Sequence, residues 1–527
     1  MKPGVCAPDT SGMPGPGRRL YLFLFILALL LRLWNLYQFI SRDPVADFLI
    51  LDGWSYDRTA QQILTGSFWG EGVFFQDPLY PYFLAGIYAA AGHSLTAVKV
   101  VQAVLGAVTV VCIAGIAAQV AGLLAGLAAG LLAAWYPTFI FYDCLIMKEG
   151  PGLFFTTAAF FVLVRLPGSN RIRRFLAAGM LFGLAVMTRG NLMLFIPFLL
   201  AWIACTASGG ATARIRAALA VALGCALILA PVTIRNRVVG GEWVLLTAQG
   251  GANLFIGNNP YSDGAAARPP YLRMSPEFEE DDFRHHAEQA LGRSLTAKEI
   301  NAYWKRQALA FITSQPREAL ALTFRKARLF FNYYEIPDNY NLYFYRRYSA
   351  LLYNPIGYGV VLVLALTGMV VLVHQWRRLS LLYLIVPVYA GSVIMFHVYA
   401  RYRLSIVPFL IVFAAALLRQ LYCWVLARRW GPVVFAGLTA VILIPLVFRQ
   451  ESHYSMARSH FMRGLGLAGQ GRDVDAAVEY EDAIRIDPEF ARAYNNLAKL
   501  RFLRGDRVAA EALWLKALDC DPELAEA

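Results

Sequence analysis

The residues of this sequence best suited to chemistry lie in a polar segment that follows its first apolar run. The carboxylates Asp52, Asp57 and Asp77 occur there together with Tyr56 and Tyr80. Carboxylates can act as general acids or bases when their surroundings tune them. Spacing alone favours a plainer role for Asp52, as the N-cap of a short helix. The segment is therefore a candidate site whose chemistry needs support from the rest of the chain.

Two short helices are expected to position these residues. From Trp54 to Leu64 apolar residues recur in a pattern suited to a helix lying along a membrane surface. Pro78 and Pro81 then mark the entry to a second interfacial helix, predicted over Leu79 to Ala91. Its tyrosines favour the headgroup level of a bilayer.

The composition predicts a polytopic, all-α membrane protein. Of 527 residues, 58% are hydrophobic and 16% are charged, and the mean hydropathy is +0.49. Soluble domains usually carry about 25% charged residues. The net charge of +13 comes mostly from arginines in short clusters between apolar runs. That pattern sets membrane topology and argues against a nucleic-acid-binding groove.

About eleven membrane spans are predicted, each near the length that a bilayer requires. They cover residues 20–40, 96–118, 120–141, 147–166, 174–188, 191–207, 214–235, 352–374, 380–399, 403–423 and 431–448. With this count all the arginine clusters fall on one side, which the positive-inside rule makes the cytoplasm. Residues 1–19 then form a disordered cytoplasmic tail. The loops 41–95 and 236–350 and the C-terminal region lie on the opposite face.

The C-terminal region carries an internal repeat. Asp487-Pro488 recurs as Asp521-Pro522, and Gly471 recurs as Gly505, both 34 residues later. This period and the residues between predict two tetratricopeptide repeats over 457–522. Because such arrays usually need about three units, the pair is expected to lean on the membrane domain, a protein partner or another copy.

Metal and disulfide chemistry receive little support. None of the seven cysteines forms a C-x-x-C pair, so neither a zinc site nor a disulfide framework is indicated. His285-His286 adjoins an acidic stretch, for which a solvated charged segment is favoured over a metal site. No cofactor is required, although a divalent metal stays open and its ligands are unknown.

An ordered set of motifs between residues 20 and 450 resembles the GT-C glycosyltransferases. The similar branch contains the protein O-mannosyltransferases and the lipid A aminoarabinose transferase. The motifs are the first-loop acid with a tyrosine four residues later, Asp77-Pro78-Leu79-Tyr80-Pro81, Phe141-Tyr142-Asp143, Met147-Lys148-Glu149, Met187-Thr188-Arg189-Gly190-Asn191, Arg235-Asn236, residues 250–260 and Arg401-Tyr402-Arg403-Leu404. In place of Gln76-Asp77, relatives often carry His or Lys followed by two prolines, which leaves the role of Asp77 open.

The resemblance implies an inverting transfer from a polyprenyl- or dolichyl-phosphate sugar. It makes Asp52 the expected base, with a pKa raised toward the useful range. Glu149 is either a second catalytic acid or a structural partner of Lys148. Four arginines are candidates for binding the donor phosphate, each with an interfacial anchoring role as its alternative: Arg189, Arg235, Arg401 and Arg403. The residues expected to contact substrate from the loops are Tyr56, Asp57, Asp77, Tyr80 and Asn253.

The leading prediction is a multi-pass glycosyltransferase of a bacterial inner membrane. Its active site and repeats would face the extracytoplasmic side, and its acceptor would be a protein, a lipid or a glycan. The alternatives are an O-antigen ligase or polymerase, and a scaffold or transporter that carries the repeats. Ligases crowd their key residues into a late loop, and transporters place ionisable residues mid-span. This sequence shows little of either pattern.

Overall fold

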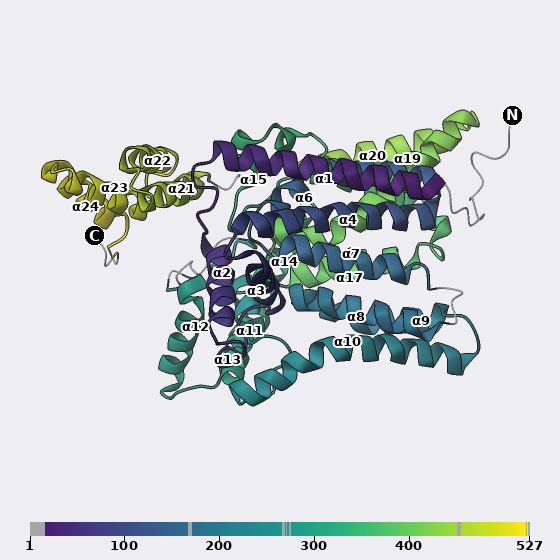
Figure 1. The fold of residues 1–527 in the computed structure, drawn as a ribbon, viewed down its shortest axis with the longest axis horizontal. Helices are drawn as coiled ribbons and strands as arrows, with labels where there is room; N and C mark the ends of the chain where they lie inside the picture. Colours follow the sequence, from purple (N-terminus) through teal and green to yellow (C-terminus); the bar gives the residue numbers. More distant parts are fainter. Residues whose placement is uncertain are drawn as a thin grey trace.

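The computed structural model describes residues 16–166, 171–265, 269, 271–272, 276–450, 455–522 and 524. Most of the predicted N-terminal tail, residues 1–15, lies outside this range. Every regular element among the described residues is a helix, so the all-α fold class is confirmed. The helices form an elongated bundle, with a group of shorter helices at one end and a separate helical tail beyond it (Figure 1).

A helix covers each of the eleven apolar stretches. They are α1 (Pro16–Arg42), α4 (Leu95–Ala121), α5 (Leu123–Ala134) with α6 (Pro137–Asp143), α7 (Glu149–Leu163), α8 (Ile172–Thr188), α9 (Ile196–Thr206), α10 (Ala211–Gly240), α16 (Tyr358–Val371), α17 (Ser380–Met395), α19 (Val407–Leu426) and α20 (Trp430–Val447). Among the described residues, five helices are long and apolar enough to cross a membrane, and the bent pair α5 and α6 would make a sixth. These apolar helices indicate a membrane protein, while the count of eleven spans stays a prediction.

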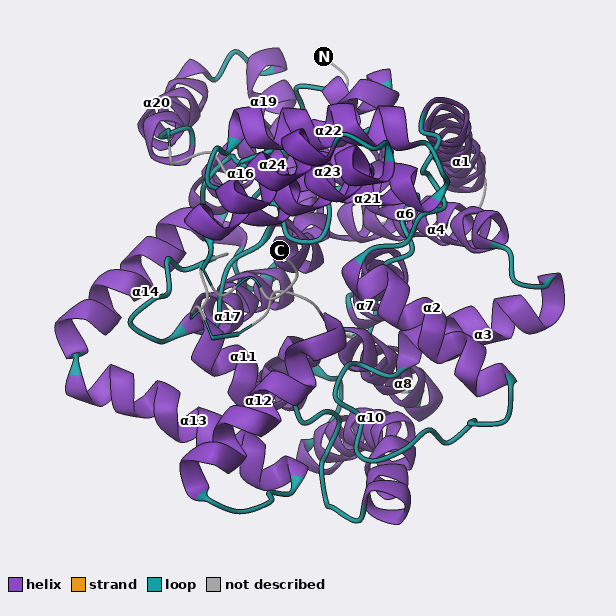
Figure 2. Ribbon diagram, turned by 90° about the vertical axis from the view of Figure 1, so that its left-hand side faces the viewer, coloured by secondary structure: helices purple, strands orange, loops and turns teal. Residues whose placement is uncertain are grey.

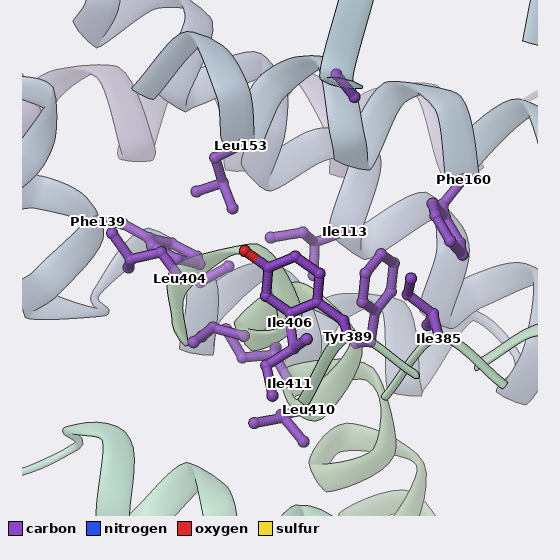
Figure 3. Close-up of a cluster of buried hydrophobic side chains, with 14 of the residues drawn as sticks. Ile113, Phe139, Leu153, Phe160, Ile385, Tyr389, Leu404, Ile406, Leu410 and Ile411 are labelled. Carbon is purple, nitrogen blue, oxygen red and sulfur yellow. The ribbon is translucent and has the colours of Figure 1, made fainter. Parts of the chain in front are cut away.

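Close backbone approach and aromatic packing hold the bundle together. A Cβ at Gly179 of α8 would lie 2.2 Å from the Val221 carbonyl oxygen of α10. Small residues at such crossings let two helices approach closely, as is common between membrane helices. Deeper in the bundle Phe160, Ile385 and Tyr389 belong to one cluster of buried side chains (Figure 3). This rigid core fixes the ends of the helices, where the polar residues gather.

The first loop forms the two expected helices. The second, α3 (Leu79–Ala91), has the predicted bounds, and α2 (Leu51–Leu64) begins three residues before the predicted start at Trp54. The N-cap prediction for Asp52 is wrong, because Ile50 is the N-cap and Asp52 lies inside the first turn. Leu51 has a φ of +48°, a left-handed conformation that is costly for a non-glycine residue. The chain therefore turns sharply just before Asp52.

The long loop supplies a second group of helices at the same end of the bundle. They are α11 (Gly250–Gly257), α12 (Pro276–Leu291), α13 (Ala297–Ser314) and α14 (Pro316–Phe330). In Figure 2 these helices lie on one side of the bundle end, and α2 and α3 lie on the other. A polar region thus surrounds the ends of the apolar helices.

A buried lysine ties the long loop to the segment that follows α17. The ammonium of Lys326 donates to the Gly257 carbonyl oxygen, to Asn258 Oδ1 and to the Phe396 carbonyl oxygen, at 2.9–3.1 Å. Burial lowers the pKa of Lys326 to about 8, since desolvation disfavours its charged form. The contact fixes Phe396, which begins the approach to Arg401.

The tail forms two consecutive helical hairpins. The first contains α21 (Ala457–Gly469) and α22 (Asp473–Ile486), and the second contains α23 (Ala491–Leu503) and α24 (Arg507–Cys520). Two tetratricopeptide repeats would have this arrangement, and the assignment of the repeat family stays a prediction.

Adjacent glycines at the start of α11 provide a test of the packing at this end. A Cβ at Gly251 would lie 2.0 Å from the Asn301 carbonyl oxygen, whereas one at Gly250 would meet Asn301 Oδ1 at an ordinary 3.7 Å. We expect Gly251→Ala to lower the free energy of unfolding by about 1–3 kcal/mol through overpacking. Gly250→Ala should change it by less than about 0.5 kcal/mol. Melting temperatures in one detergent compare the two variants, and equal values would contradict the packing.

Candidate functional site

A cavity of about 570 Å³ opens at the end of the bundle that carries α2 and the long loop. Its walls come from the first loop, the start of α7, the turn after α8, the long loop, the segment after α17 and the tail. The ionisable residues lining it are Asp52, Asp77, Lys148, Arg189, Glu279, Lys298, Asp338, His397, Arg401, Tyr402, Tyr56 and Arg458. Segments that are far apart in the sequence therefore share one polar chamber.

Arg401 joins two carboxylates in this cavity. Its Nη1 lies 2.5 Å from Asp52 Oδ2, and its Nη2 lies 2.5 Å from Asp338 Oδ2. The side chains of all three are about one-tenth exposed. Short contacts between a guanidinium and carboxylates are among the stronger hydrogen bonds of proteins. One cation thus connects the first loop, the long loop and the start of the α19 region.

The charge of Arg401 reverses the expected shift of Asp52. Burial works to raise the pKa of Asp52, but the charge and hydrogen bond of Arg401, together with Lys148, hold it below its ordinary value. The sequence-based expectation of a raised pKa is therefore wrong for this state of the cavity. Asp52 is ionised at neutral pH, as a proton acceptor must be.

Glu149 and Arg189 form a second buried pair. Arg189 Nη2 donates to Glu149 Oε1 at 2.8 Å and to the Arg401 carbonyl oxygen at 3.0 Å. The guanidinium also lies 5.0 Å from the centre of the Tyr402 ring. Arg189 lines the cavity, whereas Glu149 is only 4% exposed and does not line it. Glu149 is placed to hold Arg189 rather than to meet a substrate.

The expected pairing of Glu149 with Lys148 is wrong, because Lys148 contacts another acid. Lys148 Nζ lies 2.5 Å from Asp77 Oδ2, and both residues line the cavity. Since Asp77 precedes α3 and Lys148 precedes α7, this ion pair fastens the first loop to the bundle. Gln76 and Asn253 line the cavity nearby.

Two tyrosines expected at the site have different positions. Tyr56 lines the cavity and packs edge to face against Tyr80, with ring centres 5.1 Å apart. Tyr80 is not among the cavity-lining residues, and its hydroxyl donates to Gln102 Oε1 at 2.7 Å. Tyr80 therefore orients Tyr56 from behind.

Asp57 does not belong to the cavity. Its carboxylate accepts from the Tyr88 hydroxyl at 2.6 Å and from Gln61 Nε2 at 2.7 Å, and it lies 2.8 Å from His93 Nε2. These contacts join α2 to the end of α3 and the turn that follows it. The prediction that Asp57 contacts the substrate is therefore replaced by a structural role.

Arg403 and Arg235 also lie outside the cavity. Arg403 is 1% exposed and donates to the carbonyl oxygens of Asn332 and Tyr334 and to Glu335 Oε2, at 2.6–2.7 Å. Arg235 donates to the carbonyl oxygens of Trp69 and Gly72. Both arginines donate to backbone carbonyl oxygens and are placed to brace loops, so their expected role at the phosphate stays a prediction that this position does not support.

Sequence reasoning missed Asp338 and Arg458. Asp338 follows an aromatic-rich stretch in Ile336-Pro337-Asp338-Asn339, a turn-forming run that could have marked it. Arg458 belongs to the predicted repeats, whose pattern gives no sign that one residue reaches the cavity. The strained backbone at Leu51 has no sequence signal either.

The structure offers no new support for a metal at the histidine pair. His286 Nε2 lies 3.0 Å from the Tyr271 carbonyl oxygen, so a backbone group occupies this nitrogen. A group with ligand spacing among the described residues is in the tail, at His460, Glu479 and Asp482. There Arg463 pairs with Glu479, as expected of an ion-pair network.

Comparison with known proteins finds a family model that matches part of the chain. Residues 76–234 match the family model described as "Dolichyl-phosphate-mannose-protein mannosyltransferase". This region contains Asp77, Lys148, Glu149 and Arg189, but not Asp52 or Arg401. No curated protein matches the sequence. The family match supports a membrane glycosyltransferase of the GT-C type.

Solved structures of low similarity come from the oligosaccharyltransferase of Archaeoglobus fulgidus. The AglB complex with an inhibitory peptide and a dolichol-phosphate is 13% identical, with a TM-score of 0.46, over 84% of this chain and 58% of that one. The complex with Zn and sulfate is 13% identical, with a TM-score of 0.45, over 84% of this chain and 55% of that one. The apo form is 13% identical, with a TM-score of 0.45, over 94% of this chain and 59% of that one. This chain spans less than three-fifths of those proteins.

Arg403 allows a structural role to be separated from a role in binding. Arg403→Met leaves Glu335 buried without its cation, and losing one partner of a buried pair costs about 3–5 kcal/mol. We expect this variant to lose yield and melting temperature. The double variant with Glu335→Leu should lose less than the sum of the single changes. A stable Arg403→Met protein that has lost only its affinity for a phosphate ligand would contradict the structural role.

Proposed function

We propose that this protein transfers a sugar from a polyprenyl-phosphate donor to a hydroxyl of a protein, lipid or glycan acceptor, with inversion at the anomeric carbon. The observation that carries the proposal is the position of Arg401, which holds Asp52 and Asp338 in one cavity at the end of an apolar bundle. The partial family match, whose description names a dolichyl-phosphate mannose and a protein, supports the substrate classes.

In the proposed reaction Asp52 removes the proton of the acceptor hydroxyl. The acceptor oxygen bonds to the anomeric carbon while the bond from that carbon to the phosphate oxygen breaks. The electron pair leaves with the polyprenyl phosphate. Arg401 and Arg189 stabilise the charge on the departing phosphate, since a guanidinium can bind a phosphate through two parallel hydrogen bonds.

Binding of the donor would also make Asp52 a stronger base. A phosphate that binds Arg401 competes with Asp52 for the guanidinium. Loss of this cationic partner raises the pKa of a buried carboxylate, so Asp52 would become a better proton acceptor once the donor is in place. This coupling would also limit reaction before both substrates are bound.

The cavity has an apolar side that suits a lipid chain. Met193, Leu194, Trp243 and Leu245 line it, and the last three are between 44% and 65% exposed. Exposed large apolar side chains on a membrane protein mark surfaces for lipid contact. A polyprenyl chain lying along this side would place its phosphate toward Arg189.

The proposed topology has the cavity on the extracytoplasmic face of a bacterial inner membrane. Helix α1 begins at the end of the bundle away from α2 and the tail (Figure 1). Arg165, Arg377 and Arg428 each lie in or near a turn that follows an apolar helix running toward that end. Arginines gathered at the far end support this orientation through the positive-inside rule.

Asp52 and Asp57 are a matched pair for testing catalysis, since they occupy the same helix. We expect Asp52→Asn to reduce transfer from undecaprenyl-phosphate sugars by at least about 100-fold, as expected for loss of a general base. Asp57→Asn should retain transfer, because its carboxylate lies outside the cavity. The assay measures the glycosylated acceptor with purified protein of matched melting temperature. An active Asp52→Asn variant would refute the role of the base.

The pKa of Asp52 predicts the acid side of the pH profile. Because Arg401 holds this pKa below its ordinary value, of about 4, the free protein keeps Asp52 ionised down to at least pH 5. The kcat/KM for transfer reports the free enzyme and should not fall between pH 7 and 5 through protonation of Asp52. An acid limb near pH 6 that disappears only in an Asp52 variant with residual activity would contradict this assignment.

A further inference from the structure

The first helix of the tail docks on the segment that leads into Asp52. Gln470 Nε2 donates to the Pro44 carbonyl oxygen at 2.9 Å. A Cβ at Gly466 would lie 2.8 Å from the ring of Phe48, so the helix meets this ring closely. Val45 belongs to the same buried cluster as Phe461. Helix α21 therefore packs against the chain only a few residues before Asp52.

A second set of contacts extends along α21. The His460 ring packs edge to face on Phe344, with ring centres 5.0 Å apart. Arg463 Nε lies 3.6 Å from Asp43 Oδ1, and its guanidinium lies 5.8 Å from the centre of the Tyr348 ring. Because contacts from the first loop and from the end of the long loop converge on one helix, the position of α21 relative to the cavity is fixed.

This docking places Arg458, in the first turn of α21, on the wall of the cavity. The chamber that contains Asp52 and Arg401 is thus completed by the tail. The tail lies beyond the end of the bundle (Figure 1), and its residue Arg458 is among those that line the cavity.

Charge balance indicates what Arg458 does there. The described lining residues include five cations and four carboxylates. The cations are Lys148, Arg189, Lys298, Arg401 and Arg458, and the carboxylates are Asp52, Asp77, Glu279 and Asp338. Arg458 adds a positive charge to this wall, and a cation there strengthens the attraction of the cavity for an anion.

We infer that Arg458 is a substrate-binding residue that contacts the phosphate of the lipid-linked donor, so that the transferase site is formed jointly by the membrane bundle and the tail. This inference rests on the proposed function for the identity of the lipid. It assigns to the tail a role inside the site, separate from any partner that its outer surface binds. A guanidinium suits this role because it can grip phosphate oxygens bidentately.

Binding of undecaprenyl phosphate to the purified full-length protein tests the inference, with uncharged undecaprenol as the parallel probe. We expect Arg458→Ala to weaken binding of undecaprenyl phosphate about tenfold, which is about 1.4 kcal/mol, and to leave undecaprenol binding unchanged. Arg458→Lys keeps the charge but cannot form two parallel hydrogen bonds to a phosphate, so its affinity for undecaprenyl phosphate should lie between those of Arg458→Ala and the unaltered protein. Arg504→Ala removes the same charge from an exposed position of the tail and should bind both lipids as the unaltered protein does.

Each contrary outcome has a distinct meaning. Equal affinity of Arg458→Ala and the unaltered protein for undecaprenyl phosphate would overturn the inference. The inference would also be overturned if Arg458→Ala lost the same affinity for undecaprenyl phosphate and for undecaprenol. The same holds if Arg504→Ala lost as much affinity for undecaprenyl phosphate as Arg458→Ala. Inorganic phosphate that binds as tightly as the lipid would overturn the lipid as the source of the phosphate. An unaltered protein that binds no undecaprenyl phosphate would instead count against the proposed function.

Discussion

The arrangement of the cavity depends on Arg401, which contacts Asp52 and Asp338 at once. The backbone carbonyl oxygen of Arg401 also accepts a hydrogen bond from Arg189, which donates a second one to Glu149. Buried charges are stable only when they are paired and hydrogen-bonded. The first loop, the long loop and the segment after α17 must therefore all be in place before this network forms. The cavity is a product of tertiary structure, not of any one motif.

That dependence explains which site residues the sequence could indicate. Asp52, Arg189 and Arg401 occur in motifs resembling a known family, and the structure brings them together. Arg403, only two residues from Arg401, points instead to the carbonyl oxygens of the 329–334 segment. Neighbouring arginines in one motif cannot be told apart by type or spacing. Asp57 was misjudged for the same reason, since its partners on α3 and the following turn are visible only in three dimensions.

The fold was more predictable than the site. Apolar stretches and the positions of Gly and Pro indicated the main helices, because hydrophobic length and backbone propensity act locally. The N-cap position at Ile50, the strained Leu51 and the helical start at Gly250 were not predictable in this way. Each depends on contacts with distant segments. The same holds for Arg458, whose relation to the cavity arises from docking of α21 on the first loop.

We propose that a donor phosphate competes with Asp52 for the guanidinium of Arg401. The most direct measurement is a structure of the protein with bound undecaprenyl phosphate in a lipid nanodisc. We expect phosphate oxygens within hydrogen-bonding distance of Arg401, with the contact between Asp52 and Arg401 lengthened or broken. A phosphate bound elsewhere, with Arg401 still held between Asp52 and Asp338, would contradict it.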